Sequence, residues 1–219
     1  MRHTLVVATK NRGKLHELGL LLEGLPIDLV AYGDVLPRPL EVDEDGETFQ
    51  ENAVKKATVI AHAAMMLTLA DDSGLEVDAL HGAPGVRSAR FAHARATDAE
   101  NNAALIAALD ALSEPERDQP AFKARFRCVL ALVDPYGNDA APHVVDGTCE
   151  GSVTRNARGS GGFGYDPLFL VEGTDRTMAE LSDAEKNTVS HRARAVGKMR
   201  LVLEKVLAER EAATRRTLA

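Results

Sequence analysis

The sequence predicts an α/β fold, in which short β-strands alternate with helices. Three observations carry this prediction. Residues 4–8 form an apolar, β-branched run that is too short for a helix. Leucines then recur at helical spacing through residues 15–22. The helix-start pattern of a hydroxyl followed three residues later by a glutamate occurs at Thr48, Thr97 and Ser182.

The remaining elements follow in order along the chain. Residues 27–31 suggest a second strand, Thr48 opens a helix that runs to about residue 66, and residues 67–70 form a third strand. A further strand is expected over residues 75–80, and Thr97 opens a helix with an apolar stripe. Apolar and basic residues alternate over residues 122–132, as in a long strand, and a return strand around residues 143–153 predicts an antiparallel hairpin. Helical segments follow from residues 182 and 190, and the polar tail after Glu209 is expected to be frayed.

Composition limits the classes of function. A chain of 219 residues fits one sizeable domain or two small lobes that share a core. There is no apolar run of about 18 residues to span a membrane, and the N-terminus lacks the features of a signal peptide. Cys128 and Cys149 form no disulfide framework, so the simplest expected setting is a reducing cytoplasm. The net charge of −7 argues against a polynucleotide-binding surface.

The loop after the first strand has the character of an anion site. Thr9-Lys10-Asn11-Arg12-Gly13-Lys14 lies between that strand and a helix, an arrangement that directs backbone N–H groups at an anion. Lys14 would stand in the first helical turn, where its ammonium can meet a phosphate. The loop is not a Walker A motif, because GxxxxGK[ST] is absent. The alternative is a plain strand–helix connection with solvated basic residues.

The most unusual stretch is Asp71-Asp72-Ser73-Gly74, which follows a short apolar run. If that run is a buried strand, Asp71 and Asp72 point to opposite sides, so one can face a cleft while the other pairs locally. A carboxylate at the C-terminal end of a strand is where open α/β sheets usually place ligand chemistry, and Gly74 would let the backbone approach a ligand. The alternative is a polar turn that leaves the strand.

Three further segments each allow a functional and a purely structural interpretation. The acidic run from Glu41 to Asp45 is either a solvated face or a source of oxygen ligands for Mg²⁺. The glycine-rich segment 159–167 surrounds Phe163 and Tyr165, which suits either stacking on a nucleobase or aromatics folded into the core. His191 and Arg192 form a donor pair suited to a carbonyl oxygen, or simply lie at the surface.

Five segments of the chain together resemble one family, the inosine triphosphate pyrophosphatases, also known as dITP/XTP pyrophosphatases, which remove deaminated purine nucleotides. The resemblance spans about residues 4–207 and is carried, in order, by Thr9-Lys10-Asn11-Arg12-Gly13-Lys14, Gly46-Glu47-Thr48-Phe49-Gln50-Glu51-Asn52-Ala53, Ala70-Asp71-Asp72-Ser73-Gly74-Leu75, Gly161-Gly162-Phe163-Gly164-Tyr165-Asp166-Pro167 and Ser190-His191-Arg192. Lys10 stands where many relatives carry glycine.

The resemblance implies an elongated mixed sheet flanked by helices, with two lobes and the nucleotide cleft between them. It implies a single domain of two lobes over residues 1–209, with residues 210–219 as a polar tail. It further implies a homodimer that depends on Mg²⁺. The substrates would be purine nucleoside triphosphates and one product pyrophosphate, with no polynucleotide or membrane partner.

The family pattern also assigns roles to residues. Asp72 is implied as the catalytic carboxylate and, with Glu44, as a metal ligand, with Glu41 and Asp43 as the alternatives to Glu44 in the latter role. The residues implied to bind substrate are those of the phosphate loop, Thr9, Lys10, Asn11, Arg12, Gly13 and Lys14, together with Lys56, Ser73, Phe163, Gly164, Tyr165, Asp166, Lys186, His191 and Arg192. Phe163 would stack on the purine, with Tyr165 and Asp166 completing that wall.

The residue types suit hydrolysis of ITP, dITP and XTP to the monophosphate and pyrophosphate. Such a reaction needs a positioned water and neutralised phosphate oxygens, which a carboxylate, lysines and Mg²⁺ supply. His191 and Arg192 would donate to the 6-oxygen of the base, where adenine presents a donor instead. Three rivals are a non-hydrolysing nucleotide sensor, a house-cleaning pyrophosphatase for other modified nucleotides, and a haloacid dehalogenase-type phosphatase. The last requires DxD, whereas the two carboxylates here are adjacent.

Overall fold

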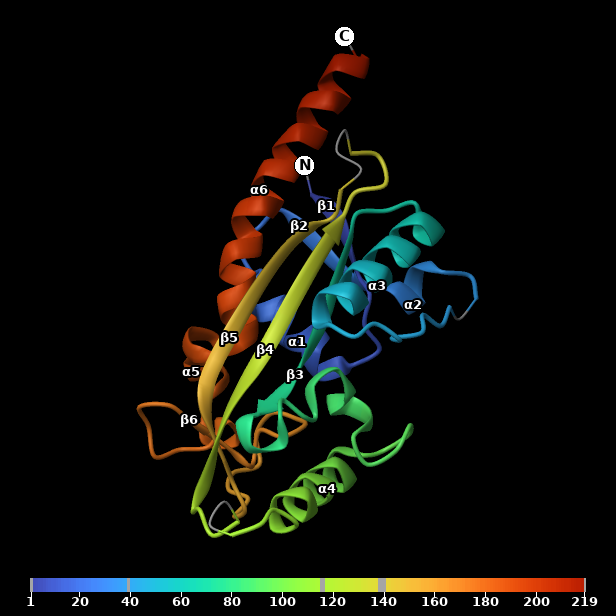
Figure 1. Ribbon diagram of the computed structural model, residues 1–219. Helices are drawn as coiled ribbons and strands as arrows, with labels where there is room; N and C mark the ends of the chain where they lie inside the picture. The colour runs from blue at the N-terminus through green and yellow to red at the C-terminus, as the bar shows by residue number, and fades with distance from the viewer. Residues whose placement is uncertain (1, 39, 115–116, 138–140, 219) are drawn as a thin grey trace. The chain divides into compact units, whose positions relative to one another are not determined.

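A computed structural model describes residues 2–38, 40–114, 117–137 and 141–218. Its six strands form one mixed sheet in the order β2-β1-β3-β4-β5-β6, flanked by helices (Figure 1). The strands are β1 (His3–Val7), β2 (Ile27–Ala31), β3 (Thr68–Val77), β4 (Ala121–Val133), β5 (His143–Thr154) and β6 (Phe169–Val171). The helices are α1 (Arg12–Leu21), α2 (Tyr32–Val35), α3 (Phe49–Ala64), α4 (Asp98–Asp110), α5 (Asp183–Val189) and α6 (His191–Leu218), with 3₁₀ helices η1 (Asp78–Leu80), η2 (Gly85–Arg90) and η3 (Met178–Glu180). The predicted α/β class and mixed sheet are confirmed.

The chain divides into two compact units. Unit 1 contains Met1–Asp72, Val129–Asp146 and Arg194–Ala219, and unit 2 contains Ser73–Cys128 and Gly147–Ala193. Strands β3, β4 and β5 each contribute residues to both units. The chain therefore crosses from unit 1 to unit 2 between Asp72 and Ser73, inside the stretch that the sequence marks as most unusual.

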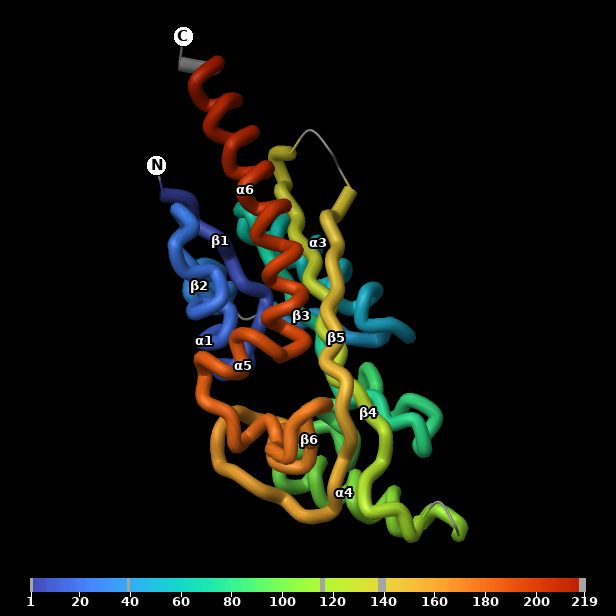
Figure 2. The backbone as a smooth tube through the Cα atoms, turned by 90° about the vertical axis from the view of Figure 1, so that its left-hand side faces the viewer, coloured from blue at the N-terminus to red at the C-terminus, as the bar shows by residue number. Residues whose placement is uncertain are grey.

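Unit 1 is built around parallel strands. Strand β1 pairs in parallel with β2 and β3, and Val7 lies opposite Leu69 at the carboxyl end of β1. Right-handed connections from β1 to β2 and from β2 to β3 place α1 and α3 on opposite faces of these strands. Helix α6 shares the face of α1, because Arg200 donates to the carbonyl oxygens of Leu21 and Glu23. Figure 2 shows α6 in front of the strands and α3 behind them.

Strand β3 is longer than the sequence predicts. The prediction of two strands, separated by a polar turn between Asp71 and Leu75, is wrong. Strand β3 runs without interruption through Thr68–Val77. The two carboxylates stay in the strand because each is paired with a lysine, as described below. Strand β1 nevertheless ends beside Leu69, so Asp71 and Asp72 lie just past the carboxyl end of a parallel neighbour.

Unit 2 has its own hydrophobic core. Residues of β4, β5 and β6 pack there with α4 and η3, and the Phe126 and Phe169 ring centroids are 4.5 Å apart. Strand β6 runs antiparallel to β5. The capping boxes predicted at Thr97 and Ser182 open α4 and α5, and the one at Thr48 opens α3 in unit 1.

Two expectations about the chain ends and cysteines can be compared with the structure. The polar tail is not frayed over residues 210–218, because α6 continues to Leu218, with Arg210 bonded to Asp134 at 2.6 Å; residue 219 lies outside the described residues. Cys128 and Cys149 are both buried, and they form no disulfide with each other. No helix within the described residues has the length and apolar character needed to cross a membrane.

Candidate active site

The predicted site residues fall into two groups, one in each unit. In unit 1 the phosphate loop follows β1 and ends at the start of α1. Asn11 caps this helix, its side chain accepting a hydrogen bond from the Lys14 backbone N–H at 3.0 Å, and the Asn11 N–H donates to the Thr9 hydroxyl at 3.1 Å. The loop backbone is therefore ordered by its own side chains, and its N–H groups lie at a helix N-terminus, as the sequence predicts.

The two adjacent aspartates pair with lysines from different helices. Lys14 on α1 contacts Asp71 at 2.6 Å between Nζ and Oδ1, and Lys56 on α3 contacts Asp72 at 2.8 Å. Because α1 and α3 cover opposite faces of the strands, the two carboxylates point to opposite sides of β3, as the alternation of side chains predicts. The Asp71 side chain is fully buried, and its pairing with Lys14 avoids an uncompensated buried charge.

Lys56 is the centre of a small charged cluster. Its ammonium lies 2.8 Å from Asp72 Oδ1, 3.2 Å from Glu44 Oε1 and 2.9 Å from the Asp71 carbonyl oxygen. The side chains of Lys56 and Asp72 are only 10% and 7% exposed, so these charges interact with little screening by water. One cation thus holds two carboxylates together.

Burial and charge shift the pKa values of this cluster in different directions. Burial raises the pKa of Asp72, and the ammonium groups of Lys56 and Lys14 offset only part of that effect. Burial acts on Glu44 too, but the Lys56 ammonium and a hydrogen bond shared with Asp72 lower the pKa of Glu44 overall. Burial lowers the pKa of Lys56, and the carboxylates of Asp72 and Glu44 outweigh it and raise that pKa. Lys56 therefore stays charged, and Asp72 is the more basic of the two carboxylates.

The acidic segment places one of its candidate ligands beside this cluster. Glu44 contacts Lys56, whereas Glu41 pairs with Lys10 at 3.0 Å in an exposed position. The segment is anchored by Asn52, whose Oδ1 accepts the Gly46 N–H at 2.8 Å. Asn52 is fully buried and stands one helical turn before Lys56, so one face of α3 holds both the acidic segment and its counter-ion. Sequence reasoning missed Asn52, although its four-residue spacing from Lys56 was visible.

The cluster fits a divalent cation that is only partly held by protein. Within the described residues, Asp72 Oδ2 is buried without a hydrogen-bond partner, which leaves a carboxylate oxygen for a further ligand. No group of three or more His, Cys, Asp or Glu side chains able to hold a metal ion occurs in the part of the chain that is described. Mg²⁺ suits such a site, because it commonly takes one or two carboxylates and fills its other positions with water and substrate phosphate.

In unit 2, Arg192 joins two predicted site residues. Its guanidinium donates to Ser73 Oγ at 3.0 Å and lies 5.6 Å from the centroid of the Phe163 ring. Arg192 is 1% exposed, and His191 beside it stacks on Phe126 with ring centroids 4.8 Å apart. Phe163 itself is only half-buried. The group therefore presents an aromatic face beside a desolvated cation.

The glycine-rich loop is held by a second buried ion pair. Lys186 contacts Asp166 at 2.8 Å, and the same Asp166 oxygen accepts the Phe163 N–H at 3.2 Å. A side chain on Gly162 would overlap Asp166 Oδ2 and lie 2.6 Å from Lys186 Nζ, so glycine is required there. In this structure Asp166 and Lys186 bond to each other, which fixes the backbone that carries Phe163.

Tyr165 and Gly74 both make packing contacts with the segment that contains η2. Tyr165 is 3% exposed and belongs to the core of unit 2, where its hydroxyl donates to the Ser88 carbonyl oxygen at 2.8 Å. The place of Tyr165 in the purine wall stays a prediction, and in this structure its ring packs within the core of unit 2. A side chain on Gly74 would meet Ser88 and the Gly85 carbonyl oxygen, so Gly74 makes room for η2 rather than for a ligand.

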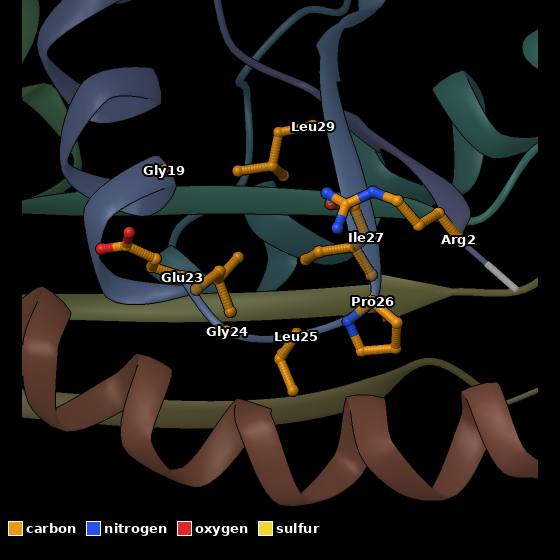
Figure 3. Close-up of a pocket in the computed structure, with 9 residues that line it drawn as sticks. Arg2, Gly19, Glu23, Gly24, Leu25, Pro26, Ile27 and Leu29 are labelled. Atoms are coloured by element: carbon orange, nitrogen blue, oxygen red, sulfur yellow. Dashed lines mark hydrogen bonds between the residues drawn. The ribbon is translucent and has the colours of Figure 1, made fainter.

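One pocket of unit 1 is separate from the predicted site residues. It has a volume of about 500 Å³ and is formed by the end of α1, the following loop and β2. Figure 3 shows Ile27 and Leu29 on its strand side, with Arg2 and Glu23 at its margin. None of the predicted site residues lines it, so the lysine–carboxylate cluster remains the candidate active site of unit 1.

The mixed sheet, with a capped phosphate-type loop after β1 and paired carboxylates on β3, defines an α/β protein of the nucleotide-binding type. The chain belongs to the Ham1 family, whose model matches residues 5–202. It is 46% identical to the dITP/XTP pyrophosphatase of Desulforamulus reducens, over 94% of this chain and 98% of the relative. It is 49% identical to the protein of the same name from Geobacter sulfurreducens, over 88% and 92%.

Solved structures agree with this assignment. A HAM1 protein from Coxiella burnetii matches with a TM-score of 0.80 and 41% identity, over 94% of this chain and all of that chain. A nucleoside-triphosphatase / dITP/XTP pyrophosphatase from Mycobacterium abscessus matches with a TM-score of 0.69 and 41% identity, over 90% and 98%. The family resemblance seen in the sequence motifs is confirmed.

Proposed function

We propose that this protein hydrolyses deaminated purine nucleoside triphosphates, namely ITP, dITP and XTP, to the monophosphate and pyrophosphate. Membership of the Ham1 family and the dITP/XTP pyrophosphatase names of its relatives support the activity and the substrate class. The single observation that carries the mechanism is the buried Asp72 carboxylate, with one oxygen on Lys56 and the other without a partner in the described part of the chain.

Asp72 would position and activate the attacking water. The water oxygen bonds to the α-phosphorus, the bridging bond between the α- and β-phosphates breaks, and pyrophosphate leaves. The proton of the water passes to Asp72 when that carboxylate acts as the general base, or Asp72 acts on the water through the metal that it would help to hold. Glu44 keeps its negative charge beside it, because its own pKa is lowered.

The basic groups of unit 1 would bind the triphosphate. Asn11 and Thr9 order the loop, α1 presents its N-terminus, and Lys14 stands in its first turn. Lys56 is held by Asp72 and Glu44 at the cluster and would neutralise charge on the reacting phosphate.

We propose Mg²⁺ as the cofactor, held by Asp72 and Glu44. When bound, Mg²⁺ would neutralise phosphate oxygens and polarise the attacking water. The free Asp72 oxygen supports this assignment, as does the lowered pKa of Glu44, which keeps that carboxylate ionised. Asn52 would contribute indirectly, by fixing the acidic segment through Gly46.

The group in unit 2 would bind the base. Phe163 offers an aromatic face for stacking, and Arg192 and His191 would donate to the 6-oxygen of hypoxanthine or xanthine. Adenine presents an amino group at that position, and a donor left unpaired there costs roughly 1–3 kcal/mol, or about 5- to 150-fold in selectivity. The 6-oxygen alone does not distinguish these bases from guanine.

We also propose a homodimer, as the family resemblance implies, and a cytoplasmic setting, which the two cysteines without a disulfide framework suggest. Sedimentation equilibrium of the purified chain tests the assembly, and a monomer at micromolar concentration would contradict it.

A substrate panel tests the proposed activity. Purified protein is incubated with ITP, dITP, XTP, GTP, ATP and UTP, with Mg²⁺ and with a chelator, and the loss of each triphosphate is followed by ion-exchange chromatography. We expect rapid loss of ITP, dITP and XTP only with Mg²⁺, and slow loss of ATP. Equal rates for ATP and ITP would contradict the base assignment, and full rates in chelator would contradict the metal assignment.

A further inference from the structure

Two side chains of helix α4 form hydrogen bonds with Gly164 of the glycine-rich loop. The Gly164 N–H donates to Asp98 Oδ2 at 2.7 Å, and the Gly164 carbonyl oxygen accepts from Asn102 Nδ2 at 3.0 Å. Asp98 and Asn102 are four residues apart and so lie on the same face of α4. Both backbone groups of the residue after Phe163 are therefore held from one helix face.

This helix is itself fixed to the neighbouring backbone. Asn101 is 3% exposed, and its amide accepts from the Ala92 N–H at 3.0 Å and donates to the Ala89 carbonyl oxygen at 3.2 Å. The next residue of the loop, Tyr165, bonds to Ser88 in the same stretch. Helix α4 and the residue after Gly164 are thus both hydrogen-bonded to residues 88–92.

The backbone at Phe163 needs these hydrogen bonds because the two glycines that flank it restrain its conformation little. Gly162 and Gly164 have φ angles of +76° and +63°, and glycine is the residue with the most backbone freedom. On one side, the Phe163 N–H is held by Asp166 at 3.2 Å. On the other side, the bonds of Asp98 and Asn102 to Gly164 are the corresponding restraint.

We propose that Asp98 and Asn102 are positioning residues that fix the Phe163 ring for the nucleobase. This inference rests on the proposed function, in which Phe163 stacks on the purine. Neither residue touches the substrate; they act through the Gly164 backbone. Because Phe163 contacts the base and not the phosphates, loosening it raises KM for ITP and leaves kcat little changed.

The size of the effect follows from the bonds that are lost. A neutral hydrogen bond contributes roughly 2- to 12-fold, so Asn102→Ala raises KM for ITP by that factor. The Asp98 contact involves a carboxylate and contributes more, so Asp98→Ala raises KM by roughly tenfold or more. Asp98→Asn retains an oxygen that can accept the Gly164 N–H and restores most of the lost affinity.

A spectroscopic readout follows the loop without depending on activity. The chain has no tryptophan, so Phe163→Trp introduces a single tryptophan, whose emission can be excited selectively over that of the three tyrosines. In this background Asp98→Ala and Asn102→Ala are expected to speed the decay of tryptophan anisotropy, and Asp98→Asn is expected to restore slow decay. Asn102→Asp, which presents an oxygen to the Gly164 carbonyl, is expected to act like Asn102→Ala.

Asp110→Ala is the matched control. Asp110 is at the other end of α4 and bonds to Arg155 at 2.7 Å, so its loss perturbs the same helix without touching the loop. It is expected to leave both KM and the anisotropy decay unchanged. Melting curves confirm that each variant is folded; if Asp98→Ala does not fold, the two Asn102 variants decide the question.

Kinetics of Phe163→Ala test the base-stacking role of Phe163 separately from the positioning role of Asp98 and Asn102. If Phe163→Ala leaves KM for ITP unchanged, the proposed base-stacking role is wrong, whatever α4 does. If Phe163→Ala raises KM while the Asp98 and Asn102 variants leave KM and the anisotropy decay as in wild type, the positioning role is wrong. If KM rises equally in Asp110→Ala and Asp98→Ala, the rise is caused by a less stable α4 and not by the lost contact with Gly164, and the inference is overturned.

Discussion

Asp72→Asn is the substitution that probes the candidate active site most informatively. Asparagine keeps the size of the side chain and an oxygen for Lys56, which now lies 2.8 Å from Asp72 Oδ1. It removes the negative charge, the capacity to accept a proton and the free carboxylate oxygen at Oδ2. The variant therefore separates chemistry from packing.

The expected loss of turnover is large compared with the loss of stability. A positioned acid–base group contributes roughly 10²- to 10⁴-fold, which corresponds to about 2.7–5.5 kcal/mol in the barrier. Breaking a buried ion pair usually costs about 3–5 kcal/mol of unfolding free energy. Here Lys56 keeps Glu44 at 3.2 Å and the Asp71 carbonyl oxygen at 2.9 Å, so we expect a cost of only about 1–2 kcal/mol.

The assay compares kcat for ITP at saturating substrate and Mg²⁺, together with the melting temperature. Asp45→Asn is the control, because Asp45 also pairs with a lysine, Lys55, at 2.6 Å, but in an exposed position. We expect it to retain wild-type turnover. A folded Asp72→Asn protein with kcat within threefold of wild type would remove Asp72 from the proposed chemistry.

Three further predictions concern the loop, a helix cap and the charged cluster. Gly162→Ala is expected to lower the melting temperature more than Gly164→Ala. Both substitutions place a side chain on a residue with left-handed backbone angles, at a cost of about 1–2 kcal/mol, but only the new side chain at residue 162 overlaps Asp166. Equal losses of melting temperature would contradict this difference in packing. Glu100 accepts hydrogen bonds from the backbone N–H and the hydroxyl of Thr97, which caps α4, and these bonds lower the pKa of Glu100 from 4.5 to about 2. The stability lost in Glu100→Gln is therefore expected to be largest above pH 4.5 and to vanish towards pH 2, as melting curves across this range can check. Lys56→Met removes the cation that two carboxylates share, so turnover should fall and the acidic limb of the pH–rate profile should move to higher pH; an unchanged limb would contradict this.

The local patterns of the sequence predicted much of the fold because they are decided by near neighbours. A hydroxyl and a glutamate three residues apart satisfy each other, so the capping boxes at Thr48, Thr97 and Ser182 were visible without knowledge of the rest of the chain. The strand over residues 143–154 likewise shows in its local residue pattern.

The errors arose where distant residues decide the conformation. Asp71 and Asp72 resemble a turn in sequence, but lysines from α1 and α3 pair with them and allow β3 to continue. The core position of Tyr165 was likewise not predicted, because that core is assembled from residues distant in the chain. The motif of the glycine-rich loop identified candidate site residues. The contacts that each of them makes depend on partners elsewhere in the chain, which sequence spacing does not reveal.

Hydrolysis in ¹⁸O-labelled water tests the central claim most directly. A single reaction with ITP and Mg²⁺ is analysed by mass spectrometry for the label in each product. The account predicts inosine monophosphate carrying one ¹⁸O atom together with unlabelled pyrophosphate, because water attacks the α-phosphorus. Label in pyrophosphate, or release of orthophosphate and inosine diphosphate, would contradict it.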